Sequence, residues 1–188
     1  MLKQTTKVVV QPSGHMLAEA TRMSTDSFLK YQESNGHYNN TQHSHLIGKL
    51  GELAVECWFQ DKCESSDPLE VLEWQWANID SAFRFPHREH DYDISYQGTR
   101  YEVKTWSLVH WEKWGRCVAK NQMPALLRKA DRIIWCTYDH EKNLVELHGW
   151  NQPATLSSIP TKDTGPANGR KVTNHQVPLR MIYGMERL

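Results

Sequence analysis

The segment from Asp93 to Trp106 constrains the fold of this chain more than any other. Two alternating stretches, residues 93–96 and 99–106, flank the dipeptide Gln97-Gly98. A two-residue connection with glycine between alternating strands is typical of a tight β-hairpin. Counting outward from this turn predicts four opposed pairs: Tyr96 with Thr99, Ser95 with Arg100, Ile94 with Tyr101 and Asp93 with Glu102.

This register places two carboxylates against each other. Directly opposed residues lie on one face with Cβ atoms about 5 Å apart, so Asp93 and Glu102 would repel. A divalent cation between them would remove the repulsion, and Mg²⁺ prefers carboxylate oxygens. Lys104, two residues after Glu102, shares their face. Asp91 would face Lys104 if the pairing continued, but Asp93 has the better spacing.

Two acids and an ammonium on one face suit metal-assisted hydrolysis of a phosphodiester. A bound metal polarises the phosphate and lowers the pKa of a water molecule. Lys104 could orient or deprotonate that water, or stabilise charge on the phosphate. The opposite face carries Ile94, Tyr101 and Val103, which suit a core. The alternative is a surface hairpin with ordinary cross-strand charges, for which acid opposite base would be the usual pattern.

The remaining pattern predicts an α+β protein, with a mixed central sheet flanked by helices. Apolar spacing indicates one helix over about 16–31 and a stronger one over about 44–60, where Gly48 and Gly51 suggest a close contact. In the second helix, Lys49, Glu52 and Glu56 fall opposite the apolar stripe. Further elements are expected in this order: irregular structure at 61–90, a helix at 124–130, strands at 132–138 and 143–150, a loop at 151–170, and a strand or short helix in 172–188.

At this point the residues resemble the PD-(D/E)xK nucleases, the restriction-endonuclease-like enzymes. Asp93, an eight-residue gap and Glu102-Val103-Lys104 are similar to their motif, although Tyr92 stands where that motif has proline. The segment 48–54 (GKLGELA) resembles the family's acidic helix. The segments 121–127 and 130–135 resemble its glutamine-containing helix and following strand. The resemblance covers about residues 44–138. It implies one domain over 1–188, with a restriction-endonuclease-like core at about 44–150 and extensions at 1–43 and 151–188.

The resemblance also implies roles for individual residues. Asp93 and Glu102 would be ligands of Mg²⁺, with Mn²⁺ as a substitute, and the Val103 carbonyl could add a third ligand. Glu52 would hold the same metal through water, or a second metal. Lys104 would be the catalytic lysine, and Gln122 would position Lys104, water or phosphate. The alternatives are a solvated helix acid for Glu52 and a polar helix-start residue for Gln122.

Charge is unevenly distributed along this neutral chain, which has 22 basic and 22 acidic residues. Residues 51–93 hold eleven acids and three bases, whereas residues 100–132 hold eight bases and three acids. A basic face for DNA is therefore compatible with zero net charge. We expect phosphate contacts from the second stretch and the tail, at Arg116, Lys120, Arg128, Lys129, Arg132, Arg170, Lys171 and Arg180.

Other classes of function have weaker support. The ten histidines, including the pairs His43/His45 and His87/His90, lack the spacing of a structural zinc site. No nucleotide-binding loop or nucleophile elbow is present. Trp106, Trp111 and Trp114 could stack on bases, but core positions are more common for tryptophan.

The expected setting is the cytoplasm, of a prokaryote or a phage. The four cysteines include no CxxC pair, which favours reduced thiols, and we recognise neither a signal peptide nor a transmembrane segment. The expected activity is DNA endonucleolysis. The alternatives are an RNA nuclease and a catalytically inactive DNA-binding or assembly protein. A homo-oligomer is left open.

Overall fold

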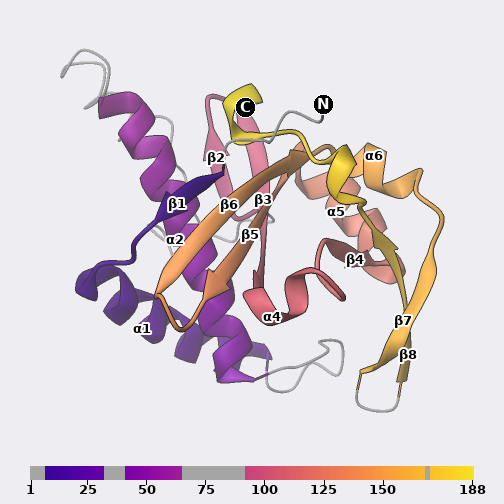
Figure 1. Ribbon diagram of the computed structural model, residues 1–188, viewed down its shortest axis with the longest axis horizontal. Helices are drawn as coiled ribbons and strands as arrows, with labels where there is room; N and C mark the ends of the chain where they lie inside the picture. The colour runs from indigo at the N-terminus through magenta and orange to yellow at the C-terminus, as the bar shows by residue number, and fades with distance from the viewer. Residues whose placement is uncertain (1–6, 32–40, 65–91, 168–169) are drawn as a thin grey trace.

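A computed structural model describes residues 7–31, 41–64, 92–167 and 170–188 (Figure 1). It is an α+β structure in which helices flank a mixed β-sheet. The helices are α1 (Gly14–Tyr31), α2 (Gln42–Glu64), α4 (Leu108–Trp111), α5 (Met123–Lys129) and α6 (Pro153–Ser157), with 3₁₀ turns η1 (Lys120–Gln122), η2 (Leu179–Met181) and η3 (Met185–Arg187). The strands are β1 (Val8–Val10), β2 (Ile94–Tyr96), β3 (Thr99–Ser107), β4 (Cys117–Ala119), β5 (Arg132–Asp139), β6 (Leu144–Asn151), β7 (Lys162–Ala167) and β8 (Arg170–Gln176).

The main sheet has five strands in the order β1-β6-β5-β3-β2. Strands β3 and β5 run parallel, and α5 lies in the connection between them. The other neighbours in this sheet are antiparallel. Its parallel pair therefore needs a crossover, which the sequence supplies as the helix predicted at 124–130.

The hairpin has the predicted register in three of the four predicted pairs. The fourth, Asp93 with Glu102, does not form, because the Asp93 N–H donates to the Tyr101 carbonyl and the Asp93 carboxylate accepts from the Val103 N–H. Ile94 pairs with Tyr101, Ser95 with Arg100 and Tyr96 with Thr99. Gln97 and Gly98 have φ angles of 48° and 74°, the conformation of a type I′ turn. Glycine adopts a positive φ without steric cost, so Gly98 allows the two strands to leave the turn in this register.

The sheet is buried on both faces. Alternate residues of β5 enter different apolar clusters: Ile134 and Cys136 lie in the one that includes α1 and α2, whereas Ile133 and Trp135 lie in the one that includes α4, α5 and α6. Figure 1 shows α1 and α2 on one side of the sheet and α5 and α6 on the other. A strand covered on both faces is a continuous apolar run, as in residues 132–138.

The predicted helices and strands form, with shifted ends. Helix α2 extends four residues past the predicted Gln60, and α1 begins two residues before Met16. Glu56 was wrongly placed on a solvated face; it is buried, because α2 packs against both α1 and the sheet. Most of the segment 61–90, including His87 and His90, lies outside the described residues, as does Asp91.

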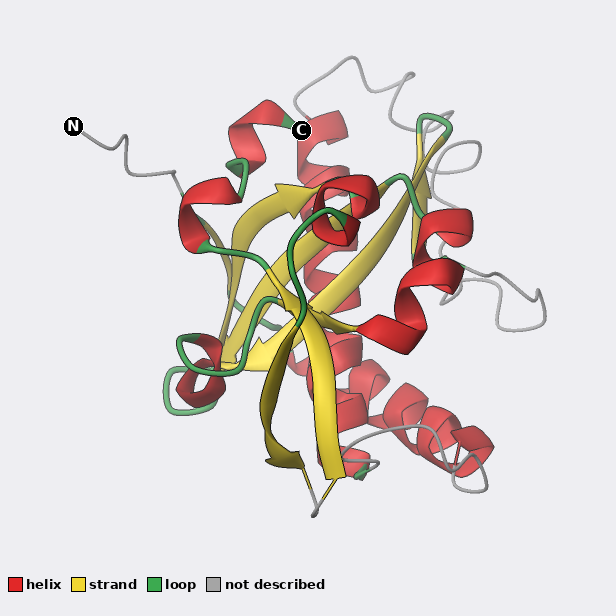
Figure 2. Cartoon of the chain, turned by 90° about the vertical axis from the view of Figure 1, so that its right-hand side faces the viewer, coloured by secondary structure: helices red, strands yellow, loops and turns green. Residues whose placement is uncertain are grey.

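The prediction of a loop at 151–170 is wrong. This segment contains α6, and β7 forms a second sheet in the order β4-β8-β7. The β7–β8 pair projects away from the five-stranded sheet (Figure 2). The pairing of β7 with β8 shifts register between Thr164 and Pro166. Because the ladder is interrupted there, this segment with its proline and glycine lacks the simple alternation from which a strand is predicted.

Candidate active site

The site lies where the pairing of β2 with β3 stops. The last pair is Ile94 with Tyr101, and the Val103 N–H then donates to the Asp93 carboxylate, with N and Oδ2 2.7 Å apart. Backbone groups of residues two apart in a strand point to the same side, so the Val103 carbonyl also faces the β2 edge. Asp93 thus ends the ladder with its side chain at the edge of the sheet.

Glu102 and Lys104 point to the face of the sheet that α5 covers. They alternate with Tyr101 and Val103, which are buried against the α2 side. The Lys104 Nζ donates to Glu102 Oε1 at 2.5 Å, and the Glu102 side chain is only 4% exposed. Lys104 was expected to share the face of Glu102, and it does. In this structure it also forms an ion pair there.

Lys129 is a residue of this site that the sequence analysis placed elsewhere. It is the last residue of α5, and its Nζ lies 2.5 Å from Glu102 Oε2. The residue was expected to contact DNA phosphates on the surface. Its position next to Glu102 depends on how α5 packs after the crossover, which residue spacing does not reveal.

Glu52 approaches from α2, on the other face of the sheet. Its carboxylate is 14% exposed and accepts from Lys49 through both oxygens, at 2.7 and 2.8 Å. Glu52 is close enough to raise the pKa of Asp93. The site therefore combines acids from α2, from the residue before β2 and from β3. Lys49 is a further residue near it that the sequence analysis did not select.

The electrostatics of the site differ from one acid to the next. Burial, followed by the negative charges of Glu102 and Glu52, raises the pKa of Asp93 to about 7. Burial also opposes ionisation of Glu102, but Lys104 and Lys129 outweigh it and hold the Glu102 pKa below its ordinary value. For Lys104, burial would lower the pKa, but Glu102 and Asp93 raise it. Lys104 is therefore protonated at neutral pH, whereas the raised pKa leaves Asp93 partly protonated there.

The donors fit a hard divalent cation in their chemistry. Three carboxylates and the Val103 carbonyl are oxygen ligands of the kind that Mg²⁺ prefers, and the raised pKa of Asp93 favours a cation beside it. Among the residues described, however, no group of three or more His, Cys, Asp or Glu side chains is arranged to hold a metal. Both oxygens of Glu102 face ammonium groups, so a metal ligand role for Glu102 requires it to exchange at least one of them.

No contact in the described part of the chain connects Gln122 with the cluster of Asp93, Glu102 and Lys104. Gln122 ends the turn η1, just before α5, and its side chain is exposed. In the described part of the chain it makes no hydrogen bond to Lys104. Its proposed role in positioning Lys104 therefore remains a prediction.

Arg116 cannot serve as a phosphate contact, and that prediction is wrong. The residue is 7% exposed, and its guanidinium donates to the carbonyls of Trp111, Glu112 and Val177. It also stacks over the ring of Trp111, which is itself buried and is therefore not a base-stacking residue. Arg116 has a positive φ of 59°, and its hydrogen bonds link α4 to the segment after β8.

The other basic candidates differ in their surroundings. Lys120 and Arg128 are exposed, whereas Arg132 is half-buried over the Trp150 ring. Arg180 is exposed in η2. The side chains of Arg170 and Lys171 lie outside the described residues, although their backbone belongs to β8.

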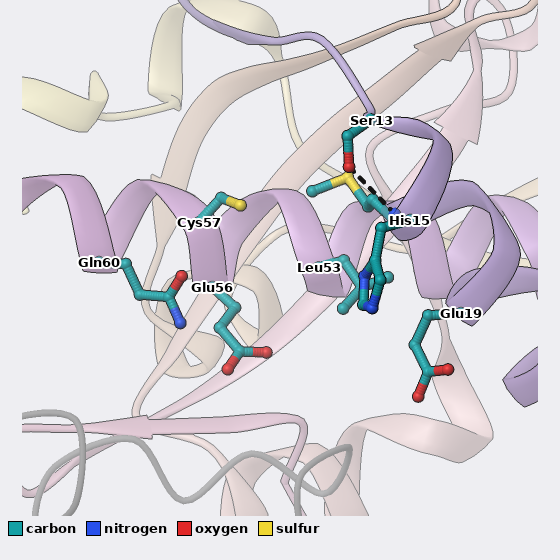
Figure 3. A pocket seen from close by; sticks show the side chains of 8 residues that line it. Ser13, His15, Glu19, Leu53, Glu56, Cys57 and Gln60 are labelled. Atoms are coloured by element: carbon teal, nitrogen blue, oxygen red, sulfur yellow. Dashed lines mark hydrogen bonds between the residues drawn. The ribbon is translucent and has the colours of Figure 1, made fainter.

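A pocket of about 370 Å³ lies away from these residues, between the start of α1 and the face of α2 (Figure 3). Its lining includes His15, Glu19 and the buried Glu56, but none of the predicted catalytic residues. Two of the histidines considered for zinc contact other side chains: His43 stacks on His140, and His45 pairs with Ser27. In the part of the chain described, these histidines belong to no group of three or more His, Cys, Asp or Glu side chains that could hold a metal ion.

None of the described helices combines the length and the apolar character required to cross a membrane. Cys117 and Cys136 are free thiols, in agreement with the expectation of reduced cysteines. In comparisons with known proteins, no protein-family model and no curated protein matches this chain.

Proposed function

We propose that this protein is a metal-dependent nuclease that hydrolyses phosphodiester bonds in DNA, on a restriction-endonuclease-like core. The observation that carries the proposal is the meeting of Asp93, Glu102 and Lys104 where the β2–β3 ladder ends. An ordinary surface hairpin would place such charges in solvent. Here the Glu102 carboxylate is buried, and Asp93 has a pKa near neutrality. Buried and perturbed groups of this kind are typical of functional sites.

The proposed enzyme would hold Mg²⁺, or Mn²⁺ in its place, with Asp93, Glu102 and the Val103 carbonyl, and with Glu52 directly or through water. The bound metal would polarise the scissile phosphate and acidify a water molecule. Lys104 would act through its charge. Its raised pKa keeps it protonated, which favours stabilisation of the phosphate over deprotonation of water. Asp93 would be ionised by the approach of a cation.

A catalytically inactive DNA-binding protein is the second candidate. One observation favours it: Glu102 is held by two lysines and Glu52 by Lys49, an arrangement that neutralises acids without any metal. On that interpretation, the cluster would be a buried ion-pair network. Such a network leaves Asp93 as the one acid of the three without an ammonium among its described contacts.

A nuclease assay separates these functions. Supercoiled plasmid, linear duplex and single-stranded RNA are incubated with Mg²⁺ or with EDTA, using the wild type, Asp93→Asn and Glu102→Gln. We expect Mg²⁺-dependent cleavage of DNA by the wild type and none by either variant, with circular dichroism showing that both variants fold. Cleavage of RNA alone would assign the RNA nuclease. DNA binding without cleavage at any Mg²⁺ or Mn²⁺ concentration would assign the inactive protein.

A further inference from the structure

Glu102 is contacted by more positive charge than it can neutralise. One carboxylate lies 2.5 Å from each of two ammonium groups, Lys104 at Oε1 and Lys129 at Oε2. The carboxylate is 4% exposed, whereas the lysine side chains are 30% and 27% exposed. A purely structural ion pair would need only one lysine. The two ammonium groups reach outward from a buried acid, so Glu102 and its two lysines together carry an excess positive charge that solvent and ligands can approach.

The fold fixes Lys129 in this place. Met123 and Leu126 of α5, and Ala130 after it, are buried in the second apolar cluster. The end of the helix is also tied to the hairpin, because Arg100 donates to the Arg128 carbonyl at 2.9 Å. Lys129 is held between these two attachments. Its ammonium therefore meets Glu102 through the packing of α5 rather than through a flexible approach from the surface.

We propose that Lys129 is a positioning residue of this site, which competes with a divalent cation for Glu102 and binds the substrate phosphate once it is displaced. This inference rests on the proposed nuclease function. A cation at Glu102 Oε2 and the Lys129 ammonium cannot share that oxygen without repulsion, so the lysine lowers the affinity of the site for metal. The displaced ammonium stays near the metal and the phosphate that it would bind. Removal of the Lys129 charge should thus raise the affinity for metal and lower the affinity for DNA.

The test measures both affinities. Binding of Mn²⁺ is followed by electron paramagnetic resonance of the free ion, without substrate or turnover. Binding of a short DNA duplex is followed by fluorescence anisotropy in Ca²⁺. We expect Lys129→Met to bind Mn²⁺ about tenfold more tightly and DNA about tenfold more weakly, each equivalent to about 1.4 kcal/mol. Lys129→Arg keeps the charge and should restore both affinities to near the wild-type values.

Arg128→Met is the control for the metal measurement. It removes one positive charge from the adjacent position of α5, where the side chain is exposed and donates to the Pro124 carbonyl. Its Mn²⁺ affinity should be that of the wild type. Lys129→Gln, which keeps a hydrogen-bond donor without the charge, replaces Lys129→Met in both measurements if the methionine variant does not fold.

Three outcomes would overturn the inference. If the wild type binds Mn²⁺ but the uncharged Lys129 variant binds it no more tightly than the wild type, Lys129 does not compete for Glu102, and the proposed function stands. If the wild type and every variant fail to bind Mn²⁺, the metal-dependent nuclease and this role of Lys129 fall together. A parallel loss of both affinities in Lys129→Met, not restored by arginine, would assign Lys129 to the fold alone.

Discussion

Gly51 of α2 lies against Thr105 of β3 so closely that a Cβ at position 51 would be 1.8 Å from Thr105 Oγ1. The helix that carries Glu52 therefore touches the strand that carries Glu102 and Lys104. This contact explains one of the two glycines in the helix. The other, Gly48, has nothing from the described part of the chain within 4 Å of the corresponding Cβ position.

We expect Gly51→Ala to destabilise the protein by about 1–3 kcal/mol, because the added methyl group must push α2 away from β3. The displacement should also move Glu52 and raise the Mg²⁺ concentration needed for cleavage. Thermal unfolding measures the first effect, and a metal titration of activity the second. The matched control is Gly48→Ala, which should be neutral or stabilising by up to about 1 kcal/mol. If Gly48→Ala and Gly51→Ala changed stability and metal requirement equally, the result would contradict the close contact of Gly51 with Thr105.

Lys104→Ala should lower the cleavage rate by about 10²-fold or more, since an electrostatic group beside the phosphate would be lost. Binding of a duplex in Ca²⁺ should change much less. Single-turnover cleavage with saturating enzyme measures the rate for the bound complex. A normal rate in that complex, together with a collapse of binding, would make Lys104 only a phosphate anchor.

The raised pKa of Asp93 predicts how stability depends on pH in EDTA. This acid binds a proton more tightly in the folded chain, with a pKa of about 7, than in the unfolded chain, where an ordinary aspartate has a pKa near about 4. The folded state therefore holds more protons between these values, and its stabilisation by Asp93 is lost as pH rises from about 4 through 7. Asp93→Asn removes this loss, since its amide oxygen can still accept from the Val103 N–H.

The measurement is the melting temperature of Asp93→Asn minus that of the wild type, at several pH values. We expect this difference to grow between pH 5 and pH 8. A difference that stays constant over that range would mean that Asp93 titrates as an ordinary exposed carboxylate.

Glu52→Gln should weaken activity and raise the metal concentration at half-maximal rate, because one acid of the cluster becomes neutral. Glu19→Gln, which removes a half-buried acid of α1 paired with Arg22, is the control and should leave the metal dependence unchanged. An unaltered metal requirement in Glu52→Gln would restrict Glu52 to its ion pair with Lys49.

The exposed bases Lys120 and Arg128 should contribute to DNA binding through phosphates. Replacing both with alanine should reduce the log–log salt slope of duplex binding by roughly two, at about 0.9 per contact. Any base specificity should survive, because phosphate contacts carry no sequence information. Arg116→Ala should act differently, with a loss of at least about 2 kcal/mol of stability, since it leaves buried carbonyls without a donor. An unchanged slope in the double variant would place the DNA elsewhere.

Local rules determined the hairpin. The turn dipeptide Gln97-Gly98 and strict alternation on both sides set the register as far as the Ile94–Tyr101 pair, and alternation placed Glu102 and Lys104 on one face. Asp93 lies beyond the last pair, where its carboxylate accepts from the Val103 N–H. Apolar periodicity likewise determined α1, α2, α5, β5 and β6 to within a few residues, because each buries a continuous stripe or run. These properties depend on neighbours within the same segment, so the sequence contains them.

Tertiary packing decided the rest. Lys129 meets Glu102 only because α5 folds back after a crossover, and Arg116 is buried only because α4 meets the segment after β8. In both cases the partner lies many residues away in the sequence. The residues next to Lys129 and Arg116 therefore do not indicate what these two side chains will contact. The strands β7 and β8 likewise depend on their partners, because β7 pairs with β8 and β8 also pairs with β4. The sequence thus determined that Glu102 and Lys104 share a face, and the fold decided how Asp93 and Lys129 come to lie beside them.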